Sequence, residues 1–108
     1  MPRVLVINET SHDFRPAAIY GEVEFLTHRD LNNNRGSALN DDLLREIGTK
    51  LINFDPEEDF LVIAGSPYVS AAVFMLLGYY GIRSLKVLRY DNRDRSYQPL
   101  YLELPDEV

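Results

Sequence analysis

The apolar residues of the chain fall into short runs separated by polar turns, and the runs differ in their periodicity. The first run, "RVLVIN" (3–8), is rich in β-branched residues and predicts a strand buried on both faces. In "IYGEVEFLT" (19–27), glutamates alternate with Val and Phe, which predicts a strand with one face in water. "FLVIAG" (60–65) predicts a further buried strand, and "SLKVLRY" (84–90) and "YQPLYLEL" (97–104) predict two more. We therefore expect five strands.

The segment after Asn40 has the periodicity of an amphipathic helix. Apolar residues recur at three- and four-residue spacing from Leu43 to Phe54, while the charged residues between them face another direction. Asn40 is expected to cap this helix, because the aspartates that follow it suit the positive end of the helix dipole. We predict a helix that lies on the sheet and ends at Asp55-Pro56.

The order of these elements, with a second helix after Ser66-Pro67, is strand, strand, helix, strand, helix, strand, strand. Such alternation predicts a Rossmann-like α/β fold, in which right-handed crossovers build a mostly parallel, mixed sheet of about five strands with two helices. The chain is expected to end in a β-hairpin whose last strand, which contains Pro99, lies at an edge of the sheet. Because no linker-like tract interrupts the 108 residues, residues 1–108 are expected to form a single α/β domain.

The second helix, which is expected to run to about Tyr80 with Gly81 as its left-handed cap, is apolar on all sides. A helix that packs on one sheet face normally keeps a polar stripe, so something else should cover the outer surface of this one. We expect an intermolecular contact, with complete burial inside the chain as the alternative. The predicted interface consists of Tyr68, Val69, Phe74, Met75, Leu77, Tyr79 and Tyr80.

Ligands of open α/β sheets usually bind beyond the carboxyl ends of the parallel strands, near helix N-termini. Two loops qualify: the polar loop after the first strand, and the start of the second helix, whose N–H groups could receive an anion. If strands one and three are neighbours, these loops face each other. The candidate ligand-binding residues are Thr10, Ser11, His12, Arg15, Gly65 and Ser66. The alternative is a plain capped strand-to-helix turn, because neither a dinucleotide fingerprint nor a P-loop lysine is present.

No catalytic constellation or metal site stands out in the sequence. Ser11, His12 and Asp13 are adjacent, whereas a triad is defined by its geometry in space, and no G-x-S-x-G elbow is present. His28 has no ligand-spaced partner, and the acidic turn at 55–59 lacks the pattern of a calcium loop, so we expect a solvated turn. Without cysteines there is neither a disulfide nor a thiolate site. We expect no cofactor, no metal and, on balance, no enzymatic activity.

The net charge is −6, from 17 acidic and 11 basic residues, which argues against a protein that binds nucleic acid by neutralising phosphates. No secretory signal is visible, and the longest apolar segment is too short to span a bilayer. We therefore expect a cytoplasmic protein that does not associate with a membrane. Five basic residues near the C-terminus could still form a local basic surface, the alternative being solvated charge on an edge hairpin. They are Arg83, Lys86, Arg89, Arg93 and Arg95.

Three stretches carry a resemblance to a known group of proteins: "HDFRPAAIYGEVEFLT", "VIAGSPYVSAAVFMLLG" and "KVLRYDNRDRSYQPLYLEL". Together they resemble small bacteriophage-encoded proteins of about this length that have no assigned activity. The shared features are the loop before the second strand, the glycine-rich end of the third strand and the Tyr-Asp hairpin. The resemblance implies a phage protein that acts in the infected bacterial cell, and it implies no reaction.

These observations favour a non-enzymatic phage accessory or host-modulating protein that acts by protein–protein binding. Its expected partners are itself, as a homodimer or higher oligomer, and a host or phage protein. The competing hypothesis is a small nucleotide- or phosphate-binding domain, including a hydrolase, that uses the crevice between the 8–15 loop and the Gly65-Ser66 helix start. A third hypothesis is nucleic-acid binding through the basic surface between Arg83 and Arg95.

Overall fold

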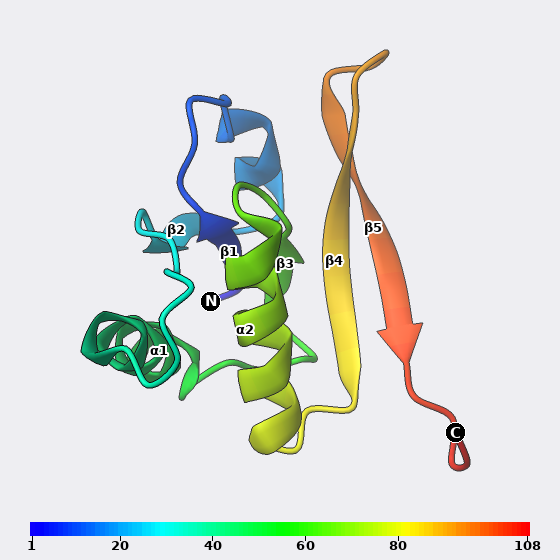
Figure 1. Cartoon of the computed structure of the whole chain (residues 1–108). Helices are drawn as coiled ribbons and strands as arrows, with labels where there is room; N and C mark the ends of the chain where they lie inside the picture. Colours follow the sequence, from blue (N-terminus) through cyan, green and yellow to red (C-terminus); the bar gives the residue numbers. More distant parts are fainter.

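The computed structural model describes residues 1–108 and contains one five-stranded sheet with both α-helices on the same face (Figure 1). The strands are β1 (Arg3–Asn8), β2 (Glu22–Thr27), β3 (Phe60–Val62), β4 (Ser84–Asp91) and β5 (Ser96–Glu103). The helices are α1 (Ala38–Leu51), α2 (Pro67–Tyr79) and the short 3₁₀-helix η1 (Arg15–Ile19). The five strands, the two α-helices and the terminal hairpin confirm the predicted α/β class.

The strands lie in the order β2-β1-β3-β4-β5. β1 is parallel to both of its neighbours and β3 is parallel to β4, whereas β4 and β5 are antiparallel. From β1 the chain crosses to β2 on one side, and from β2 it crosses back over β1 to β3 on the other side. Because both crossovers are right-handed, they lie on opposite faces of the sheet. η1 therefore lies on one face and α1 and α2 on the other. This is a doubly wound strand order with the last strand reversed, and the strand that contains Pro99 is an edge, as predicted.

The core between the sheet and the α-helices follows the alternation of β1. Leu5 and Ile7 point to the helices, whereas Val4 and Val6 point to the opposite face, and all four are buried. The helices contribute apolar side chains at three- and four-residue spacing, which places them on one stripe of each helix. These side chains are Leu43, Ile47, Leu51, Val69, Val73 and Leu77.

The start of α1 differs from the sequence expectation. Ser37, and not Asn40, is the N-cap, and its hydroxyl accepts a hydrogen bond from the Asn40 N–H at 3.3 Å. The Asn40 side chain exchanges two hydrogen bonds of 2.9 Å with the backbone of Asn32. Asn40 lies in the first turn of α1, after the cap, and its side chain stabilises the loop that leads into the helix.

The opposite face of the sheet is covered by η1 and by aromatic rings instead of an α-helix. Residues 19–21, expected at the start of the second strand, belong to η1 and its turn, so β2 begins only at Glu22. Tyr20 ties this segment to the far edge of the sheet, because its hydroxyl donates to the carbonyl of Tyr97 at 2.8 Å. The side chains that pack on this face include Phe14, Tyr20, Phe25, Phe60, Tyr90 and Tyr97.

The acidic turn before β3 is not wholly solvated, contrary to expectation. Asp59 is 3% exposed and accepts hydrogen bonds from the backbone N–H groups of Arg3 (3.0 Å) and Asp55 (2.9 Å). Its carboxylate also pairs with the Arg3 guanidinium at 3.1 Å. Glu57 and Glu58, by contrast, are exposed. Asp59 thus fastens the start of β1 to the turn that precedes β3.

We predict that Asp59→Ala lowers the free energy of unfolding by about 2–4 kcal/mol, because two backbone N–H groups and the Arg3 guanidinium lose their common, buried acceptor. Urea denaturation followed by circular dichroism measures this change. Glu58→Ala, one residue away and exposed, is the control and should change stability by less than about 0.5 kcal/mol. Equal effects of the two substitutions would contradict the assigned role of Asp59.

Candidate functional site

The two loops of the predicted crevice do lie side by side, because β1 and β3 are neighbours. The space between them is occupied by Asn8, the last residue of β1, which is 8% exposed. Its amide nitrogen donates to the carbonyls of Thr27 (3.3 Å) and Arg29 (3.1 Å), and its carbonyl oxygen accepts from the Ser66 N–H (3.0 Å). A Cβ at Gly65, where φ is +76°, would overlap the Asn8 side chain. The Asn8 side chain therefore joins the two loops that the sequence predicted to face each other.

The start of α2 is capped as predicted, and the capping side chain binds N–H groups of the first helical turn. Ser66 is the N-cap, and its hydroxyl accepts from the N–H groups of Tyr68 (3.2 Å) and Val69 (3.4 Å). Pro67 has no N–H, and the Ser66 N–H is bound to Asn8. The N–H groups of Ser66, Tyr68 and Val69 are thus already bonded within the chain.

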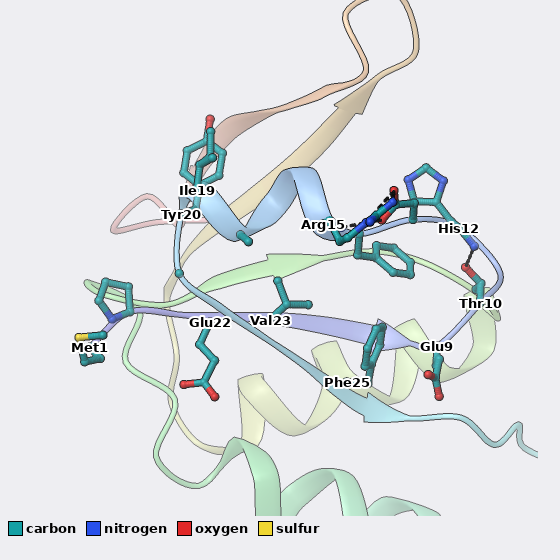
Figure 2. Close-up of a pocket in the computed structure, with 15 residues that line it drawn as sticks. Met1, Glu9, Thr10, His12, Arg15, Ile19, Tyr20, Glu22, Val23 and Phe25 are labelled. Atoms are coloured by element: carbon teal, nitrogen blue, oxygen red, sulfur yellow. Dashed lines mark hydrogen bonds and ion pairs between the residues drawn. The ribbon is translucent and has the colours of Figure 1, made fainter.

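The other predicted ligand residues belong to the η1 side of the sheet. Figure 2 shows Thr10, His12 and Arg15 along the segment that leads from β1 into η1. The Thr10 hydroxyl accepts from the His12 N–H at 3.1 Å, and Ser11, between them, is exposed. The structure therefore gathers Thr10, His12 and Arg15 around one hollow and leaves Gly65 and Ser66 outside it.

Ser11, His12 and Asp13 do not form a catalytic triad. The Asp13 carboxylate is bound by the Arg15 guanidinium at 2.9 Å, and this hydrogen bond lowers the pKa of Asp13 to about 2. The His12 ring instead makes edge contacts with the rings of Phe14 and Tyr90, with centroids 5.0 and 4.7 Å apart. The histidine ring therefore adds to the layer of aromatic rings on the η1 face of the sheet, which we call the aromatic layer.

A hollow of about 870 Å³ lies between η1 and the edge strand β2, and we call it the β2 hollow. Val23 and Phe25 form its floor, and Ile19, which is 79% exposed, lies on the η1 side (Figure 2). Glu9 and Glu22 lie near its two ends. Sequence reasoning missed this hollow, because it expected 19–21 to continue the strand. The available signal was Pro16, whose fixed φ favours a tight turn over an extended strand.

The outer side of α2 is a second exposed feature, and it is smaller than predicted. Val69 and Leu77 are 0% and 2% exposed in the core, so they cannot contact a partner, and Phe74 is half-buried. Tyr80 is partly used within the chain, because its hydroxyl lies 2.9 Å from where a Cβ of Gly48 on α1 would stand. Of the predicted interface, the exposed side chains are Tyr68, Met75, Tyr79 and Tyr80.

Residues 2–104 match the model of a protein family described as phage Pam3 gp32-like protein. The chain belongs to this phage protein family. The match spans every strand and helix, and it confirms the resemblance to small phage-encoded proteins. No curated protein and no solved structure matches the chain.

The basic residues of this phage family member do not gather on one face. Alternation along β4 points Lys86 to the aromatic face, where its ammonium lies 4.4 Å from the centroid of the Phe60 ring, and points Arg89 to the opposite face. Arg93 pairs with Asp91 at 3.6 Å, and Arg83 donates to the carbonyl of Pro105. Arg95 lies in the hairpin turn with a φ of +53°. The predicted basic surface is therefore divided between two faces and a turn.

Two further findings concern the whole chain. None of its helices has the length and apolar character needed to cross a bilayer. Nowhere do three or more His, Asp or Glu side chains gather in an arrangement that could hold a metal ion.

We predict that Asn8→Ala lowers the free energy of unfolding by about 2–3 kcal/mol, because two carbonyls and one N–H lose their partner at once. Thermal or urea denaturation measures the loss. Asn92→Ala makes the same change in the exposed hairpin turn and should leave stability within about 0.5 kcal/mol of the parent protein. A loss no larger than that of Asn92→Ala would show that Asn8 does not hold the loops.

A second prediction concerns the Asp13–Arg15 pair. Arg15→Ala removes the guanidinium hydrogen bonds, so the pKa of Asp13 should rise from about 2 toward its ordinary value of 3.8. NMR titration of the side-chain carboxyl carbon follows this pKa directly. Arg45→Ala, which breaks an exposed pair with Asp42 instead, should leave the Asp13 titration unchanged. An unchanged pKa in Arg15→Ala would contradict the assigned pair.

Proposed function

We propose that this phage protein is a non-enzymatic accessory or host-modulating factor that acts by protein–protein binding in the cytoplasm of the infected bacterium. We propose further that it associates with itself through the α2 surface, which we define as Tyr68, Met75, Tyr79 and Tyr80. The observation that carries the proposal is that three of these large side chains are more than three-fifths exposed on one helix: Tyr68 (71%), Met75 (66%) and Tyr79 (84%).

The chemistry of the α2 surface favours a protein partner. Tyrosine and methionine are enriched in protein–protein interfaces, where they bury much apolar area with few charges to desolvate. No charged residue occurs between Asp59 and Arg83. Beside the helix, an apolar groove lined by Phe74 and Ile82 continues to Leu102 and Leu104 at the hairpin. A partner on α2 could therefore extend its contact onto the last strand.

The overall charge favours a second copy as the occupant. With a net charge of −6, two copies repel each other over most of their surfaces at low ionic strength. The α2 surface carries no charged side chain, so a contact between two copies there would meet the least repulsion and would bury large apolar side chains. A two-fold axis would place the same patch of both copies in contact. Ala71 and Gly78, small and exposed on this helix, would let two helices approach closely.

The competing functions receive no comparable support. Phosphate or nucleotide binding depended on free N–H groups at Ser66, and these are bonded to Asn8 and to the cap. Nucleic-acid binding depended on one basic surface, and Lys86 and Arg89 point to opposite faces.

We predict that the parent protein sediments as a dimer at tens of micromolar, and that Met75→Glu raises the dissociation constant at least about ten-fold, which is about 1.4 kcal/mol. A carboxylate at Met75 would be buried opposite its own copy, which is costly. Analytical ultracentrifugation over a concentration series measures this constant, and circular dichroism verifies the fold.

Ile52→Glu is the matched control, because it makes the same apolar-to-acidic change at an exposed position of the α1 end. It should leave the dissociation constant within about two-fold of the parent value. A parent protein that is monomeric at every concentration would overturn the self-association proposal, as would an equal effect of Ile52→Glu.

A further inference from the structure

We propose that β2 binds a second kind of partner: an extended peptide with alternating basic and apolar residues, which adds as a strand to the outer edge of β2. This inference concerns a different surface from α2 and goes beyond the function proposed above. It depends on three features that meet at one edge of the sheet: open backbone groups, the β2 hollow and a row of glutamates.

The backbone of β2 is open at its outer edge. The Glu22 N–H donates to the carbonyl of Pro2 at 3.2 Å, so Glu22 and Glu24 direct their backbone groups toward β1. Val23 and Phe25, which alternate with them, direct theirs outward. Lys50 covers only the end of this edge, where its ammonium donates to the carbonyls of Phe25 and Leu26, both at 3.1 Å. The N–H and C=O of Val23 and the N–H of Phe25 remain open to a further strand.

The other edge of the sheet is less suited to strand addition. The Leu104 N–H donates to the carbonyl of Arg83, so the hydrogen-bonded pairs alternate along the β4–β5 ladder and the Leu88–Pro99 pair is not one of them. The outward position at Pro99 therefore lacks a donor in the middle of the strand. Such a proline discourages pairing of sheet edges. The edge of β2 has no equivalent protection over Val23.

The β2 hollow determines one half of the partner's sequence. Val23 and Phe25 point into the hollow from the sheet, and Ile19 lines it from η1 (Figure 2). A strand added beside β2 would direct every second side chain to this same face. Those side chains would meet an apolar floor, so they should be apolar or aromatic.

The glutamates determine the other half. Leu26 packs in the core beneath the α-helices. Glu22 and Glu24 are four and two residues before it in the strand, so their side chains point to the same face of the sheet, and both are exposed. Glu24 has one ion pair, with Arg3 at 3.5 Å, and Glu22 has none. The partner's remaining side chains should therefore be lysine or arginine. A second copy is disfavoured here, because β2 paired with β2 would bring like charges together.

A fluorescein-labelled peptide, Lys-Val-Lys-Phe-Lys-Val-Lys with blocked ends, tests the proposal by fluorescence anisotropy on the full chain. The block peptide Lys-Lys-Val-Phe-Val-Lys-Lys has the same composition and charge without the same alternation. We expect the alternating peptide to bind at least about ten-fold more tightly than the block peptide. We also expect it to slow the amide hydrogen exchange of Val23 and Phe25 at least about ten-fold, because strand addition protects these N–H groups.

Charge-reversal variants identify the edge. Glu22→Lys should weaken binding of the alternating peptide at least about five-fold, since it reverses an exposed charge beside the added strand. Glu103→Lys makes the same change on β5 and should have less than about a two-fold effect, as should Met75→Glu on α2. Equal affinity for the two peptides, equal effects of Glu22→Lys and Glu103→Lys, or binding without protection of Val23 would each overturn the proposal.

Discussion

The hydrogen bonds of Asn8 hold together the carboxyl end of the sheet, and much of the remaining structure depends on them. One amide side chain joins β1 to the last residue of β2, to Arg29 just beyond it, and to the residue before α2. A carboxylate at this position could accept from Ser66 but could not donate to two carbonyls, and an apolar residue could do neither. Because Gly65 has no Cβ, the amide can approach its backbone closely. The Asn8 side chain thus lies between β1 and the start of α2, at the end of the sheet where doubly wound folds usually bind their ligands.

The fold was largely predictable from the sequence, because apolar periodicity depends on neighbours a few residues apart. The strands, both helices, the Ser66 cap and the edge position of Pro99 all follow from such local patterns. Long-range features were not predictable in the same way. Asp59 looks like any residue of an acidic turn until Arg3, distant in the chain, is placed beside it. Similarly, an α2 that is apolar on all sides gives no indication of which side faces the sheet, so Val69 and Leu77 were assigned to the wrong side.

The candidate site was harder to predict than the fold for a related reason. The loop after β1 was correctly expected at the carboxyl end of the sheet, but only the hydrogen bonds decide whether a helix start has donors to offer. For the basic residues, the sequence did contain the information: positions 86 and 89 have opposite parity in a strand, so Lys86 and Arg89 could not share a face. In a strand, closeness in sequence therefore does not predict which side chains share a surface. Whether the residue numbers are both odd or both even predicts it better.

The aromatic layer under η1 has a further consequence for how this domain can change over evolutionary time. The crossover from β1 to β2, residues 9–21, has the usual length of such a connection, but its only helical part is the five-residue 3₁₀-helix η1. Large rings drawn from four strands cover the part of the sheet face that an α-helix would normally cover. The crossover is therefore a position where inserted residues could form an additional layer without disturbing the strands beneath.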